Sequence, residues 1–117
     1  MQNTKHEQLT AAGINVEMAL ERFMGNEMLL ERFLKKFPED PNFEKLEDAM
    51  EKGDRESALQ AAHTLKGVCG NLSMESLYAE LDLQVKAMRA GNWQEAQERM
   101  PGIARMVREV CQTLQNI

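Results

Sequence analysis

Residues with reactive or charged side chains gather in the stretch 61–72, which reads AAHTLKGVCGNL. His63 is the clearest candidate nucleophile, because a neutral imidazole can attack an electrophilic centre. Lys66 follows one helical turn later and carries a positive charge that would stabilise an anionic product. An accessible imidazole beside an ammonium group suits transfer of an anionic group such as phosphoryl.

The residues around His63 predict a helix that turns the imidazole toward solvent. Asp54 follows Gly53 and is a good N-cap, so the helix should begin there. At 100° per residue, one narrow face carries the apolar residues that should meet the core: Ala58, Ala62, Leu65 and Cys69. His63 lies well away from the centre of this face, so we expect it to point outward.

Two glycines in this helix are unusual, because each costs about 1 kcal/mol relative to alanine inside a helix. Helical side chains lean toward the N-terminus, so a side chain at position 67 would cover the surface around His63. Gly67 leaves that surface open, and we expect Gly70, on the same shoulder, to extend the opening. Close helix packing explains Gly67 poorly, because it lies almost opposite the core face.

The pattern His-x-Leu-Lys-Gly at 63–67, followed by Cys-Gly-Asn-Leu at 69–72, resembles the motif of histidine-containing phosphotransfer (Hpt) domains. These domains serve the multistep two-component phosphorelays of bacteria. The segments 13–16 and 19–25 are also similar to the N-terminal region of many bacterial Hpt domains, so the resemblance covers most of the chain. Taken alone, His63 could be an ordinary surface histidine and Lys66 a solvated charge.

The resemblance implies a phosphorelay intermediate. His63 would accept a phosphoryl group from an aspartate of a receiver domain and pass it to another receiver, with Lys66 attracting the phosphoryl oxygens. The partners would be response-regulator receiver domains and a hybrid histidine kinase. The chain would be a phosphocarrier rather than an enzyme, without a cofactor of its own, and Mg²⁺ would belong to the receiver. Two alternatives are a helical adaptor that is not phosphorylated and a binding module that inhibits a kinase.

A receiver must come close to His63, so its footprint should include the residues that helical spacing places nearby. These are Glu56, Leu59, Gln60, Gly67 and Gly70, with Lys66 beside the phosphoryl group. Leu59 lies between the core face and the exposed shoulder, so it could supply apolar contact at the centre of a small interface.

Many family members carry a polar residue on the following helix that orients the imidazole. Counting back from Gly91 places that position at Val85, and the neighbouring polar residue is Gln84. Gln84 is either an interior amide or a hydrogen-bond partner of His63, and the sequence leaves both open. Ser73, where glycine is common in the family, should cap the next helix.

Composition limits the class of protein. The chain has 117 residues, 43% of them hydrophobic and 28% charged, which suits one soluble domain spanning 1–117. A net charge of −5 gives no support for binding nucleic acid or an anionic membrane surface. No apolar run is long enough to predict a membrane span. No signal-peptide pattern predicts export.

The two cysteines are too few and too far apart in the sequence to form a zinc pattern, and two histidines cannot build a His-rich zinc site. Gln60 stands where a di-iron bundle would need glutamate before His63. We interpret Cys69 and Cys111 as small buried apolar residues in a reducing, cytoplasmic setting.

Apolar periodicity predicts an all-α fold, an antiparallel up-down four-helix bundle with short N-terminal capping helices. The expected helices cover 16–24, 27–37, 42–52, 55–70, 74–90 and 93 to the end, with residues 1–12 part helical and part frayed. Pro38 and Pro41 should bend or divide one helix, and Pro101-Gly102 should kink or restart the last. A bundle closed within one chain suggests a monomer, and the initial Met and complete terminal helices favour a free-standing protein. The sequence does not identify the kinase, the regulator, the output or the phosphorylated nitrogen.

Overall fold

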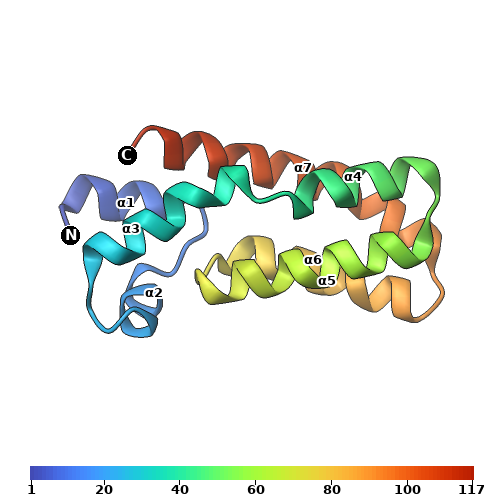
Figure 1. The fold of residues 1–117 in the computed structure, drawn as a ribbon, viewed down its shortest axis with the longest axis horizontal. Coiled ribbons are helices and arrows are strands. Elements are labelled where there is room, and N and C mark those ends of the chain that lie inside the picture. Colours follow the sequence, from blue (N-terminus) through green and yellow to red (C-terminus); the bar gives the residue numbers. More distant parts are fainter.

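The computed structural model describes residues 1–117, and its secondary structure is helical throughout (Figure 1). The elements in order are α1 (Asn3–Ala11), α2 (Val16–Arg22), α3 (Glu27–Lys36), the 3₁₀ turn η1 (Phe37–Glu39), α4 (Asn42–Lys52), α5 (Arg55–Asn71), α6 (Glu75–Arg89) and α7 (Trp93–Gln115). Helices α4 to α7 pack as antiparallel neighbours, with α1 and α2 at one end of the bundle. The whole chain forms a rod of 43 × 23 × 20 Å. The predicted four-helix bundle with N-terminal capping helices is confirmed.

Four helices begin where the sequence predicts a side-chain cap. Asn15, Asn26, Asp54 and Asn92 each accept a hydrogen bond from the backbone N–H three residues on. Such a bond satisfies a donor that has no partner within the first helical turn, so it fixes where the helix starts.

The prediction for Ser73 is wrong. Helix α6 begins at Glu75 without a side-chain cap, and Ser73 is buried in the preceding turn with a φ of 53°. Its carbonyl accepts a hydrogen bond of 2.8 Å from the Asn15 N–H, which joins the α5–α6 turn to the N-terminal segment. A positive φ favours glycine, so Ser73 holds a backbone conformation that glycine adopts more easily.

The prolines act differently in the two segments that contain them. Pro38 lies in η1 and separates α3 from α4, so this segment forms two helices rather than one. Pro101 lies inside α7, which continues through it, so the last helix does not restart there. Pro101 and Gln97 are both exposed, so water can bond the Gln97 carbonyl that the missing proline N–H leaves free.

One apolar core runs through the bundle and includes residues from every α-helix. Leu9 of α1 is fully buried in it, so the N-terminal segment is helical and packed rather than frayed. Cys69 is buried and Cys111 half-buried, and both are free thiols. Burial raises the pKa of the Cys69 thiol to about 12. None of the helices is both long enough and apolar enough to cross a membrane.

Candidate functional site

Helix α5 presents His63 on the surface of the bundle. Its predicted core residues Ala58, Ala62, Leu65 and Cys69 are all fully buried, whereas His63 is exposed. The core face of α5 packs between α4 and α6, and this fixes the direction of the imidazole. The expected outward orientation of His63 is therefore confirmed.

The two glycines of α5 have different surroundings. A Cβ placed on Gly67 would meet no atom within 4 Å, so the surface beside His63 is open and no close helix contact requires glycine there. A Cβ on Gly70 would lie 3.2 Å from Cε2 of Tyr78. The Tyr78 ring thus occupies the space that we expected Gly70 to leave open, and Gly70 allows that ring to lie against the helix.

Lys66 contacts neighbouring side chains and does not extend freely into solvent. Its Nζ lies 3.2 Å from Oδ1 of Asp82 and 5.8 Å from the centroid of the Tyr78 ring, and 15% of the side chain is exposed. The other Asp82 oxygen binds Lys86 at 2.9 Å. Hydrogen bonds from Lys86 and then Lys66 lower the pKa of Asp82, so its carboxylate stays ionised and partly neutralises Lys66.

Arg89 contacts the imidazole, although periodicity along a single helix does not predict this contact. Its Nη2 lies 3.4 Å from Nδ1 of His63. Arg89 is the last residue of α6, and the antiparallel pairing that joins Lys66 to Asp82 brings it beside the preceding turn of α5. Antiparallel pairing across the short α5–α6 turn was the signal that could have pointed to this residue.

Gln84 is fully buried between α6 and α7. Its Nε2 donates hydrogen bonds to the Ala96 carbonyl at 3.2 Å and to Sδ of Met100 at 3.4 Å, while Oε1 has no partner. This arrangement matches the interior-amide alternative. In this structure the side chain that meets the His63 ring is Arg89, not Gln84.

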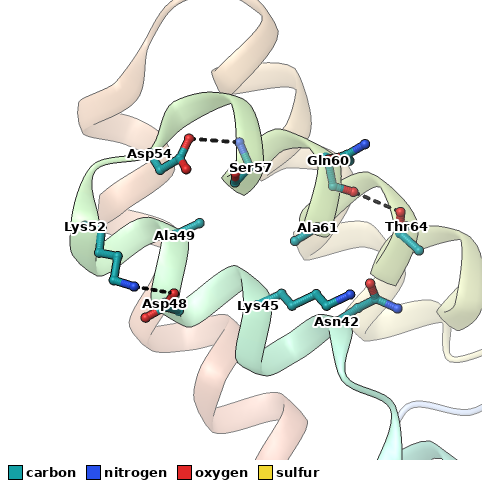
Figure 2. A pocket seen from close by; sticks show the side chains of 10 residues that line it. All are labelled: Asn42, Lys45, Asp48, Ala49, Lys52, Asp54, Ser57, Gln60, Ala61 and Thr64. Atoms are coloured by element: carbon teal, nitrogen blue, oxygen red, sulfur yellow. Dashed lines mark hydrogen bonds and ion pairs between the residues drawn. The ribbon is translucent and has the colours of Figure 1, made fainter.

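The expected docking residues surround the histidine on α5. Glu56 and Gln60 are exposed and Leu59 is half-buried. Gln60 and Thr64 line a polar groove of about 530 Å³ between α4 and α5, and Figure 2 shows Lys45 on its far wall. A hydrogen bond of 2.9 Å from Thr64 Oγ1 to the Gln60 carbonyl lies along the α5 wall.

A second hollow begins beside Gly67, where α5 is uncovered. It has a volume of about 570 Å³ and is lined by Gly67, Gly70, Tyr78 and, from α2, Met18 and Arg22. The exposed faces of Met18 and Tyr78 give it apolar surface beside charged groups. No group of three or more His, Cys, Asp or Glu side chains is placed to hold a metal ion.

A family model described as the Hpt domain matches residues 28–116, which is more than half of the chain. The chain belongs to the Hpt family. Hpt domains are phosphocarriers that act in phosphorelays and interact with receiver domains and kinases. The match starts in α3, so α1, α2 and the similarity noted at 13–25 lie outside it. No curated protein and no solved structure is significantly similar to the chain.

Proposed function

We propose that this Hpt domain carries a phosphoryl group on His63, taking it from an aspartyl phosphate of one receiver domain and giving it to another. The observation that carries this proposal is an exposed imidazole next to the uncovered Gly67, within the residues that match the family. The other histidine, His6, bonds through Nε2 to Glu17 at 2.9 Å and lies outside that match.

In the proposed transfer, a lone pair on the His63 ring attacks phosphorus in line with the aspartyl oxygen. The N–P bond forms as the P–O bond breaks, and the electron pair returns to the aspartate carboxylate. Such a transfer depends mainly on positioning and charge neutralisation, which an exposed side chain on a rigid helix can share with its partner. The family resemblance assigns Mg²⁺ to the receiver. Transfer to the second receiver reverses these steps on the same surface.

We assign Lys66 the role of a cation for the phosphoryl oxygens. In the unphosphorylated chain it is bound to Asp82, so it would have to exchange that carboxylate for the phosphoryl group. In this exchange Lys66 replaces one ionised acceptor by another, so it keeps a charge-assisted hydrogen bond.

The receiver would cover the α5 shoulder around His63, including Glu56, Leu59, Gln60, Gly67 and Gly70. Leu59 is the half-buried apolar residue at its centre, and the two hollows beside α5 could receive projecting side chains. We further infer a monomer in a reducing, cytoplasmic setting, which suits the two free cysteines.

The test is incubation with a receiver that carries labelled phosphate, using His63→Gln and the matched control His6→Gln. The wild type and His6→Gln should take up acid-labile, base-stable label, and His63→Gln should take up none while keeping its helix content by circular dichroism. Label on the nitrogen of another residue in His63→Gln would refute the assignment. No label on any of the three proteins would favour the adaptor or kinase-inhibiting alternatives.

A further inference from the structure

The contact between Arg89 and His63 defines where the ring proton lies. A guanidinium group only donates hydrogen bonds, so Nδ1, 3.4 Å from Arg89 Nη2, must be the acceptor. A neutral imidazole with an accepting Nδ1 carries its proton on Nε2. While this contact lasts, Nε2 has no lone pair for attack, and the lone pair of Nδ1 faces the guanidinium.

Arg89 is also the cation near His63 that has no carboxylate partner. Lys66 and Lys86 share Asp82, at 3.2 and 2.9 Å, whereas Arg89 forms no salt bridge in the structure. Its side chain is exposed at the end of α6, so it can change direction without disturbing the core. A phosphoryl group is a better acceptor for it than a neutral imidazole, because ionised acceptors form hydrogen bonds about twice as strong.

We propose that Arg89 is a positioning residue that exchanges one acceptor for another. In the resting chain it binds Nδ1 and keeps the proton on Nε2. When an aspartyl phosphate arrives, the guanidinium moves to the phosphoryl oxygens and releases the ring. This inference rests on the proposed function, because the incoming phosphoryl group is what draws Arg89 away.

The proton balance of this exchange is simple. Once Arg89 has left, the ring loses its Nε2 proton to water and takes one from water at Nδ1. The Nε2 lone pair then forms the N–P bond as the aspartyl P–O bond breaks, and Nδ1 keeps its proton. The incoming phosphoryl group therefore creates the tautomer with which it reacts.

The variant Arg89→Met removes the donor and the charge but keeps a long side chain, so His63 stays similarly covered. Arg89→Lys keeps the charge, and Arg105→Met controls for loss of an exposed arginine elsewhere. The probes are ¹⁵N NMR of the labelled imidazole, reaction with diethyl pyrocarbonate, and transfer from a phosphorylated receiver. Peptide mass spectrometry separates the diethyl pyrocarbonate adduct on His63 from that on His6.

Reaction with diethyl pyrocarbonate and phosphoryl transfer from the receiver should change in opposite directions in Arg89→Met. In Arg89→Met, the Nδ1–H tautomer and the reaction of Nε2 with diethyl pyrocarbonate should both rise roughly three- to tenfold, the range expected for loss of one hydrogen bond. Transfer from the receiver should slow by roughly tenfold, because the phosphoryl group loses a charge-assisted donor. Arg89→Lys should show smaller changes in the same directions, and Arg105→Met should match the wild type.

The same tautomer ratio in the wild type and in Arg89→Met would show that Arg89 does not bind Nδ1 in the resting chain. Faster reaction with both the receiver and diethyl pyrocarbonate would show that Arg89 only shields the ring, and would overturn the exchange. Slower transfer together with an unchanged tautomer ratio of His63 would show that Arg89 only binds the phosphoryl group. It would overturn the proposal that Arg89 controls the tautomer. A wild type that accepts no phosphoryl group would refute the proposed function, while the NMR result would still decide the resting contact.

Discussion

Two cations reach the neighbourhood of His63 from different directions and with different partners. Lys66 is on the same helix and is paired with Asp82, whereas Arg89 comes from α6 and touches the imidazole itself. The resting site therefore holds one compensated and one uncompensated positive charge beside His63. Asp82 determines that difference, because it binds Lys66 and Lys86 together.

Asp82→Asn should lower the free energy of unfolding at pH 7. The pKa of Asp82 is lowered in the folded chain from its ordinary 3.8. The stability that its carboxylate contributes is therefore fully present well above pH 3.8, and it is lost as the pH falls through the folded pKa. The difference between wild type and variant should therefore shrink toward zero in acid. Urea titrations at several pH values measure this difference in unfolding free energy. A difference that stays constant into strong acid would show that the ion pairs of Asp82 do not cause it.

Lys66→Ala should slow phosphoryl transfer more than it weakens docking of an unphosphorylated receiver, because we assign its charge to the phosphoryl oxygens. Lys86→Ala is a matched control that removes the other partner of Asp82. Transfer rates and binding affinities on the same proteins decide the matter. Equal losses in rate and affinity for Lys66→Ala would make it a docking contact only.

The sequence predicted those features of the site that depend on one helix. Helical spacing was enough to place His63 outside and to show that Gly67 leaves it uncovered. It did not identify Arg89, the pairing of Lys66 with Asp82 or the position of Tyr78 on Gly70. Each of these depends on the register between α5 and α6, which periodicity within a single helix does not determine.

Helix α5 contains two glycines with different consequences for stability. Gly67→Ala should raise the free energy of unfolding by up to about 1 kcal/mol, because alanine is the better helix former and the new Cβ meets no atom. Gly70→Ala should gain less, because its Cβ would lie 3.2 Å from the Tyr78 ring. Chemical denaturation of both variants tests this order, and an equal or larger gain for Gly70→Ala would contradict it.

Gly67→Leu should fold but transfer phosphoryl slowly, since the leucine side chain would lean toward His63. Gly67→Ala is the control for helix propensity. Parental transfer by a folded Gly67→Leu protein would remove the argument that Gly67 provides access.

At the scale of whole helices, the sequence predicted most boundaries because caps and glycines act locally. Asn15, Asn26, Asp54 and Asn92 start helices as expected. The error at Ser73 occurs where tertiary structure overrides a local preference. Ser73 does not cap α6 but takes a left-handed conformation in a turn joined to Asn15.

The whole molecule includes a segment that the family match does not cover. Helix α1 contributes Leu9, fully buried, to the common core, and Lys5 binds Glu31 of α3 at 2.7 Å. Leu9→Ala should therefore lower the free energy of unfolding by about 2–5 kcal/mol, the usual cost of a large-to-small change in a core. The exposed Thr4→Ala is a suitable control. A loss below about 1 kcal/mol in urea unfolding would mean that α1 packs only loosely.

We propose that His63 holds a phosphoryl group and can pass it on. The most direct measurement starts with the purified, labelled phosphoprotein, adds an unphosphorylated receiver and magnesium without nucleotide, and follows both chains. We predict that label leaves His63 and appears on the receiver in equal amount, and that a receiver lacking its acceptor aspartate takes up none. Label that stays on the chain, or that appears only as inorganic phosphate, would contradict the proposed role as a phosphocarrier.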